Sequence, residues 1–408
     1  MSASRHRALV TLVVAGAVVF GAAVIRRQAR VPEASPSASA SPSSVAPSLE
    51  GGGRAPHAFE ITGRGRGLVR FTSLLRAARE GSRERVRVLV FGDSHVQGGL
   101  YPDALRARLV EVFGDGGPGY VQLGSAEHPR RGLRLRARGF EPNPRAPSSP
   151  IRDERVVGLG GVDFVATGEA ARAELESLSP APRLAWELCV RGGAGRELGL
   201  RIGDAAPRRI QLVGAATTRL PFSTTPPHRL TVDVPRGAAL CGLVGSSEEP
   251  GAVVDALGVN GARIATVLAR SEASFAEELA RAAPDLVIVA LGTNETSDEP
   301  VRAPSYQAEL AELVARVHRS APEASCLVVG PTPRADRDAA SVAIDQALSG
   351  SSRELGCAYL SWVEHFQSAA RAKELGWLGP DGIHFSERGY TEMGEALAAA
   401  LLRDEGSP

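Results

Sequence analysis

Residues 86–95 read VRVLVFGDSH, and this stretch decides the fold class. Its first six residues are apolar or β-branched apart from one arginine, and a glycine follows them, which is typical of a buried strand. Residues 102–113 come next and place apolar side chains on one helical face: Leu105, Leu109 and Val112. A buried strand followed closely by an amphipathic helix indicates an α/β unit.

The same alternation resumes after residue 250. The expected strands are 253–257, 285–291, 326–329 and 357–361. The expected helices are 262–283, 306–318, 339–349 and 387–402. Strands that alternate with helices of this length predict a doubly wound α/β domain, in which helices cover both faces of a parallel sheet.

Residues 131–250 follow a different pattern. Short apolar runs are separated by Gly, Pro and Ser, and the runs are 155–159, 183–190, 198–202, 209–213 and 229–234. Strands at such spacing predict an antiparallel β-sandwich or jelly roll inserted into the α/β domain. We therefore expect the α/β domain in two parts, 61–130 and 251–408, with a β-rich insert at 131–250.

The N-terminal residues 1–30 contain an uncharged run, 8–25, with arginines on both sides. As a helix this run spans about 27 Å, barely enough to cross a bilayer. It predicts an uncleaved signal anchor or transmembrane helix, and a cleaved signal is the alternative. Residues 31–60 are rich in Ser, Pro and Ala and predict a flexible linker. We expect a membrane-anchored protein whose folded part is exported, periplasmic or extracellular, or else a cleaved and secreted form.

Composition and cysteines limit the partners. The chain of 408 residues has 47 basic and 46 acidic residues, so its net charge of +1 gives no reason to expect nucleic acid. The histidines lack metal-ligand spacing, and we predict neither a metal nor another cofactor. The four cysteines are Cys189, Cys241, Cys326 and Cys357. Four buried thiols and one or two disulfides both remain open.

Three polar motifs each follow an expected strand, at the sheet edge where ligands bind in open α/β folds. Ser94 lies at a strand-to-helix turn, which suits a nucleophile whose own N–H also faces an oxyanion. Asn294 can donate its side-chain amide to such an oxyanion. Asp381 precedes His384 by three positions, so one tight loop can present both, with His384 taking the proton of Ser94. Singly, each motif is usually an N-cap or a turn.

Together, a serine first, an asparagine in the middle and Asp-x-x-His last resemble the SGNH/GDSL hydrolase family. Residues 258–261 (GVNG) are similar to that family's second block. The resemblance implies a flavodoxin-like fold with a catalytic triad of Ser94, Asp381 and His384. It also implies an oxyanion hole formed by Ser94, Gly261 and Asn294. The chain departs from the family at Glu295, where Asp is more frequent, and at His95, where Leu is usual.

Residues 113–120 (FGDGGPGY) and 255–262 (DALGVNGA), with a β-rich insert between them, resemble bacterial peptidoglycan O-acetylesterases. This resemblance implies a carbohydrate-binding-like insert and an O-acetylated cell-wall glycan as substrate. Two alternatives remain: a polysaccharide O-acetyltransferase with the same triad, and a non-catalytic glycan-binding protein. The intact set of Ser94, Asp381 and His384 weighs against the second alternative.

Two groups of residues have both a structural and a functional interpretation. Trp186, Trp362 and Trp377 can stack on sugar rings, although we favour a place in the core for each. Five arginines between residues 130 and 138 predict a solvated strand edge, and a contact with anionic glycan is the alternative.

Overall fold

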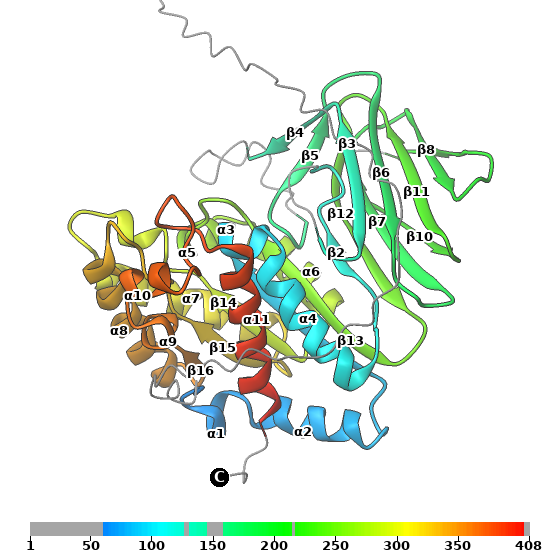
Figure 1. Cartoon of the computed structure of the whole chain (residues 1–408). Coiled ribbons are helices and arrows are strands. Elements are labelled where there is room, and N and C mark those ends of the chain that lie inside the picture. The colour runs from blue at the N-terminus through cyan, green and yellow to red at the C-terminus, as the bar shows by residue number, and fades with distance from the viewer. Residues whose placement is uncertain (1–59, 126–129, 145–157, 214–216, 404–408) are drawn as a thin grey trace, which may run out of the picture. The chain divides into compact units, whose positions relative to one another are not determined.

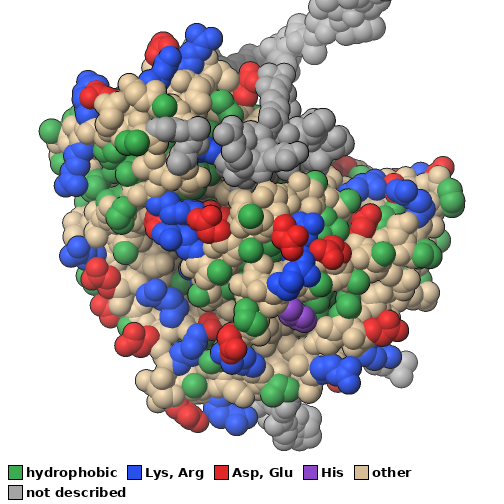
Figure 2. Space-filling view, turned by 180° about the vertical axis from the view of Figure 1, so that it is seen from behind, with side chains coloured by type: hydrophobic (Ala, Val, Ile, Leu, Met, Phe, Trp, Pro, Cys, Tyr) green, Lys and Arg blue, Asp and Glu red, His purple; other side chains and the backbone are tan. Residues whose placement is uncertain are grey.

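The computed structural model describes residues 60–125, 130–144, 158–213 and 217–403. The predicted anchor and residues 31–59 of the predicted linker lie outside these ranges. Within them, no helix combines the length and the apolar character needed to cross a membrane. On the face seen in Figure 2, basic and acidic side chains are intermixed, in keeping with the balanced composition.

A five-stranded parallel sheet forms the centre of the α/β domain (Figure 1). Its order is β13, β1, β14, β15, β16, and every neighbouring pair is parallel. The bounds are β1 (Arg85–Gly92), β13 (Gly251–Gly258), β14 (Leu286–Ala290), β15 (Ser325–Val329) and β16 (Ala358–Leu360). Counting only these strands along the chain, the order is 2-1-3-4-5, which is the flavodoxin-like order. The expected fold class is confirmed.

Helices cover both faces of this sheet. They are α1 (Arg64–Gly67), α2 (Val69–Arg79), α3 (Ser94–Gln97), α4 (Leu100–Phe113), α5 (Ile264–Leu268), α6 (Glu272–Ala282), α7 (Ala303–Ser320), α8 (Asp338–Glu354), α9 (Trp362–Phe366), α10 (Ala369–Glu374) and α11 (Glu387–Leu402), with a 3₁₀ turn at Glu295–Ser297. Strand side chains alternate between the faces, so Val88 and Val90 pack in one core with α2, α4 and α11. Leu89 and Phe91 pack in the other core with α6, α7 and α8.

Two helix predictions were wrong in detail. The expected helix 262–283 is two helices, α5 and α6, because the hydroxyl of Ser271 accepts a hydrogen bond from the N–H of Ser274 and caps the start of α6. Val112 was expected on the same apolar helical face as Leu105 and Leu109. It is 45% exposed, because the last turn of α4 is only partly covered.

The insert consists of antiparallel strands in two sheets. One sheet has the order β10 (Thr217–Thr224), β7 (Leu184–Arg191), β12 (Ala239–Ser247), β5 (Asp163–Ala166), β4 (Phe140–Asn143), and β2 (Gly119–Val121) also pairs with β12. The other has the order β3 (Leu133–Arg138), β6 (Ala171–Ser177), β11 (His228–Val234), β8 (Glu197–Ile202), β9 (Arg208–Gln211). Buried residues of both sheets share one hydrophobic core, as in a sandwich.

The predicted β-rich insert is therefore confirmed in kind. Four of its five expected runs are strands, β7, β8, β9 and β11. The fifth, 155–159, lies mostly outside the described residues, and its last residue, Leu159, is in a turn. The exact segment boundaries at residues 60, 130 and 250 stay predictions.

The predicted arginine-rich edge is only partly solvated. Strand β3 lies at the edge of its sheet and exposes Arg134, Arg136 and Arg138. Arg130 was wrongly placed on that edge. Its side chain is 10% exposed, and its Nε donates to the carboxylate of Asp103 in α4 at 2.8 Å.

All four cysteines are bridged, which excludes the alternative of four free thiols. Cys189 of β7 is joined to Cys241 of β12, and Cys326 of β15 is joined to Cys357, the residue before β16. Both bridges therefore connect neighbouring strands.

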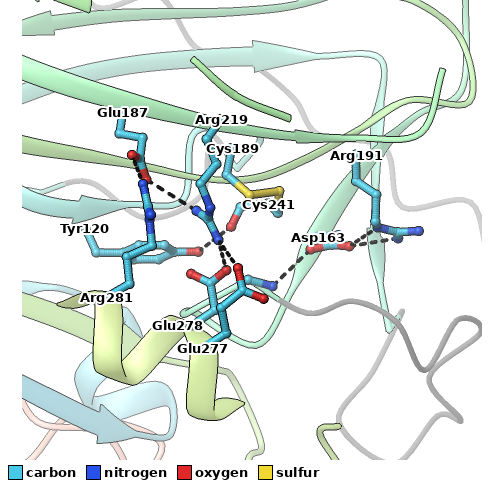
Figure 3. The surroundings of a disulfide bond; sticks show 11 residues. Tyr120, Asp163, Glu187, Cys189, Arg191, Arg219, Cys241, Glu277, Glu278 and Arg281 are labelled. Atoms are coloured by element: carbon cyan, nitrogen blue, oxygen red, sulfur yellow. Dashed lines mark hydrogen bonds and ion pairs between the residues drawn. A yellow bond between two sulfur atoms is a disulfide. The ribbon is translucent and has the colours of Figure 1, made fainter. Parts of the chain in front are cut away.

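Ion pairs near the first bridge connect the insert to helix α6 (Figure 3). Arg219 of β10 pairs with Glu187 of the neighbouring β7 and with Glu278 of α6. Glu187 also accepts from the Nε of Arg281 in α6 at 2.9 Å. The insert and the α/β domain therefore share a charged contact in addition to their covalent connections.

A second contact lies where the chain enters and leaves the insert. The carboxylate of Asp255 in β13 is fully buried and accepts from the Nε of Arg87 in β1 at 2.7 Å. It also accepts from the N–H of Tyr120 in β2 at 2.7 Å. One buried charge thus joins two strands of the parallel sheet to the first strand of the sandwich.

We expect Asp255→Asn to lower the free energy of unfolding by about 3 kcal/mol, because the largely buried Arg87 guanidinium loses its counter-charge. Asp233→Asn is a matched control, since Asp233 forms a partly exposed pair with Arg172. The control should change stability by less than about 1 kcal/mol. Denaturant unfolding followed by circular dichroism measures both variants. Equal small losses would contradict the prediction.

Candidate active site

Ser94 is the first residue of α3, directly after β1. The turn before it is tight, because a Cβ on Gly92 would lie 2.2 Å from a methyl carbon of Val96. Asp93 is buried, and its carboxylate accepts from the N–H of His95 at 2.9 Å, which caps α3. Chain direction and this turn place the Ser94 hydroxyl at the carboxyl edge of the sheet, as the sequence predicts.

The structure brings Ser94 together with His384 and Asp381. The Nε2 atom of His384 lies 2.8 Å from the Oγ of Ser94. The Nδ1 atom of His384 lies 2.7 Å from the carboxylate of Asp381. The other carboxylate oxygen accepts from the N–H groups of Ile383 and His384, at 3.0 and 2.9 Å, and shapes the loop. In this arrangement the imidazole can accept the hydroxyl proton of Ser94.

The charge of Asp381 suits that task. Burial raises the pKa of its carboxyl, but the hydrogen bonds from the His384 ring and from the two N–H groups outweigh burial and lower the pKa to about 2. The carboxylate is therefore ionised near neutral pH and can stabilise a protonated His384.

Asn294 follows β14 and lies against the other strand exits. Its Nδ2 group donates to the carbonyl oxygen of Ala262 at 2.9 Å and to the carboxylate of Asp93 at 3.4 Å. The second bond is long, and therefore weak.

Gly261 lies in the adjoining turn after β13. Its φ of +72° is in the left-handed region, which favours glycine. Among the described residues, neither the N–H of Gly261 nor that of Ser94 has a hydrogen-bond partner. The structure therefore gathers the three predicted oxyanion donors at neighbouring strand exits.

Glu295 has a contact that the sequence did not reveal. Its fully buried carboxyl accepts from the N–H of Ile264 at 2.8 Å and so ties the start of α5 to the exit of β14. Its second oxygen, Oε2, has no hydrogen-bond partner among the described residues. Burial raises the pKa of Glu295 to about 7, although the Ile264 N–H acts in the opposite direction.

His95, seen in the sequence only as a departure from the family, is buried beside His384. The centroids of the two rings are 5.3 Å apart. The Nδ1 of His95 lies 2.9 Å from the Tyr390 hydroxyl, and its Nε2 lies 3.2 Å from that of Thr332. Burial lowers the pKa of His95 to about 3, so a neutral ring supports His384. Tyr390 and Thr332 carried no signal in the sequence.

The remaining clusters of ligand-type residues do not suggest a metal. Within the described part of the chain, His318, Cys326 and Cys357 lie close enough to share an ion. The two cysteines form a disulfide and so lack the thiolates that would bind it.

Comparison with known proteins agrees with the fold. Residues 234–391 match the GDSL-like lipase/acylhydrolase family. This segment of the chain therefore matches a GDSL-like acylhydrolase domain, which supports a carboxylic ester hydrolase.

Solved structures refine the likeness of the fold. A peptidoglycan O-acetylesterase aligns with a TM-score of 0.70 at 23% identity, over 82% of this chain and 95% of that chain, so the alignment extends into the insert. An acetylxylan esterase of Geobacillus stearothermophilus aligns with a TM-score of 0.30 at 19% identity, over 38% of this chain and 74% of its own. A putative lipolytic GDSL protein of Desulfitobacterium hafniense aligns with a TM-score of 0.32 at 16% identity, over 36% of this chain and 81% of its own. No curated protein sequence matches the chain.

Replacing Glu295 by Gln tests its raised pKa. Its folded-state pKa of about 7 lies above the ordinary 4.5, so its contribution to stability is complete below about pH 4 and is lost as the pH rises through 7. We expect the wild type to lose of the order of 1–3 kcal/mol between about pH 4 and pH 8 through this group. Glu295→Gln should lose less.

Unfolding free energies of both proteins at several pH values in this window measure the difference. Glu354→Gln, at the exposed end of α8, is the control and should follow the wild type. If the unfolding free energy of Glu295→Gln changes with pH as much as that of the wild type, Glu295 does not titrate in this window.

Proposed function

We propose that the protein hydrolyses O-acetyl esters on cell-wall or other extracellular glycans, with Ser94 as nucleophile. The observation that carries the proposal is the continuous contact from Ser94 Oγ to His384 Nε2 at 2.8 Å and from His384 Nδ1 to Asp381 at 2.7 Å. A serine activated by an oriented imidazole is the arrangement that acyl transfer requires.

The reaction runs in two halves. His384 takes the proton of Ser94 as the hydroxyl oxygen attacks the acyl carbonyl, and the carbonyl oxygen becomes negatively charged. The N–H groups of Ser94 and Gly261 and the amide of Asn294 stabilise that charge. His384 then protonates the departing sugar oxygen, which leaves an acyl ester on Ser94. Water, deprotonated by His384, releases the acid and restores the serine.

The substrate class has two supports. The fold, insert included, is similar to that of a peptidoglycan O-acetylesterase. The side chains of His384 and Asp381 are 45% and 48% exposed, so the nucleophile lies beside an open surface. An acetyl group on a bulky polymer can reach such a surface, whereas a long acyl chain would gain little burial there.

The location outside the cytoplasm is also part of the proposal. We infer that residues 1–30 anchor the protein in a membrane or direct its export, and that the described domains lie on the outer side. The disulfides Cys189–Cys241 and Cys326–Cys357 support this location, because such bonds persist in oxidising compartments.

An O-acetyltransferase is the second candidate, because the same open surface admits a sugar hydroxyl in place of water. The two activities differ only in the acceptor that attacks the acyl ester on Ser94. A panel of acetylated glycans and p-nitrophenyl esters, with acetate release and acetyl transfer measured together, separates them. If acetyl transfer exceeds acetate release, the protein is an acetyltransferase and the proposed hydrolysis is wrong.

Ser94→Ala should lower kcat for ester hydrolysis by about 10⁴-fold or more, because the nucleophile is lost. Folding and glycan binding should be unchanged. Acetate release measures the rate, and the exposed Ser73→Ala serves as control with wild-type activity. Near-normal turnover by Ser94→Ala would overturn the mechanism.

Asn294→Ala should lower kcat by roughly 10²- to 10³-fold with little change in KM, because an oxyanion donor acts mainly in the transition state. Asn294→Asp keeps the size of the side chain, removes the donor and should lose a similar factor. Steady-state kinetics on a p-nitrophenyl ester give both constants. A change confined to KM would assign Asn294 to substrate binding instead.

A further inference from the structure

The three tryptophans differ in exposure. Trp186 and Trp362 are each 2% exposed and belong to the core, as the sequence favours. Trp377 is partly exposed and lines an open hollow of about 730 Å³. Helix α11, red in Figure 1, forms the other wall of this hollow with its first turns.

Aromatic neighbours hold the Trp377 ring in place. The ring of His365 lies parallel to it, with an interplanar angle of 7° and centroids 6.3 Å apart. The ring of Phe366 meets it edge-on, with centroids 5.5 Å apart. A rigid aromatic side chain binds a flat ligand at low cost in conformational entropy.

The hollow adjoins the loop that carries His384. The carbonyl oxygen of Trp377 accepts from the N–H of Ser386 at 2.7 Å. Leu378 and Phe385 form an antiparallel bridge. The segment from Trp377 to Ser386 therefore carries both the aromatic wall of the hollow, at Trp377, and the imidazole of His384 next to Ser94.

The polar residues of the hollow suit a neutral sugar. Glu387, Glu392 and Glu395 supply three carboxylates, and Arg388 supplies the only guanidinium among the lining residues. Thr391 adds a hydroxyl. Glu387 already accepts from Arg131 at 3.1 Å. Glu392 lies 3.5 Å from the Nε2 of His365. Each carboxylate has further acceptor positions for sugar hydroxyls, and the three carboxylates still outnumber the guanidiniums of Arg131 and Arg388, which disfavours a polyanion.

We propose that this hollow is a subsite for a neutral sugar ring of the glycan whose acetyl ester reacts at Ser94. The ring stacks its C–H face on Trp377, and its hydroxyls donate to the carboxylates of α11. The proposal rests on the proposed function, because a subsite beside His384 serves a glycan substrate. It assigns part of polymer recognition to the α/β domain instead of to the insert alone.

Kinetics on two substrates test the subsite. Trp377→Leu should raise KM for acetate release from O-acetylated peptidoglycan about tenfold and leave kcat/KM for p-nitrophenyl acetate within about twofold. Trp377→Phe, which keeps an aromatic face, should restore most of the polymer activity. Val342→Ala removes an exposed apolar side chain from α8 and should change neither activity.

Two kinetic outcomes would overturn the proposal. If both activities of Trp377→Leu fall together, the ring supports the His384 loop and is not a sugar platform. If neither changes, the hollow binds no part of the substrate.

Fluorescence tests binding without turnover. Chitotetraose, a neutral oligomer of N-acetylglucosamine, should quench tryptophan emission of Ser94→Ala, because Trp377 is the tryptophan that a ligand can reach. The signal should vanish in Ser94→Ala/Trp377→Phe, and persistence there would overturn the subsite. If the wild type cleaves small esters but no glycan ester, the proposed function fails, while this titration still decides whether Trp377 binds sugar.

Discussion

The buried carboxylate of Asp255 is the contact on which the arrangement of the two domains depends. It accepts from Arg87 of β1 and from the N–H of Tyr120 in β2, while Asp255 itself lies in β13. Strand β1 ends at Gly92, two residues before Ser94, and β13 leads to Gly261, so one buried carboxylate joins both strands that lead to the site and the strand at the entrance to the insert. A charge that has left water requires such close partners, and this requirement makes the geometry specific.

Buried carboxyls beneath the strand exits connect the segments of the site. Asp93 accepts from His95 and from Asn294, and Glu295 accepts from Ile264. If both acids were fully ionised, their negative charges would repel, and so destabilise, the negative charge that develops on a reacting carbonyl oxygen. Burial raises the pKa of each to about 7, which reduces this opposition and leaves the carboxyls as positioning groups.

In the proposed function, an exposed nucleophile and the residues around it share the recognition of the substrate. The exposed imidazole of His384 leaves room for a polymer but contributes little binding area. In the insert, Trp186 is buried and donates its Nε1–H to the hydroxyl of Thr224 at 2.8 Å, so it offers no stacking surface. The partly exposed Trp377 lies instead on the α/β domain. Binding energy from such a remote contact can be used to orient the ester.

The sequence alone determined the features that depend on neighbouring residues. Periodicity located strands 86–91 and 285–291 and helix 387–402, and strand ends located Ser94 and Asn294. The Asp381–His384 loop was found from its Asp-x-x-His spacing; the sequence had predicted it after a strand, but it follows α10. The pairing of the four cysteines, the contact of His95 with Tyr390 and the exposure of Trp377 were decided by tertiary structure. Each joins residues far apart in the chain or depends on what packs around a side chain, and local patterns carry no information about either.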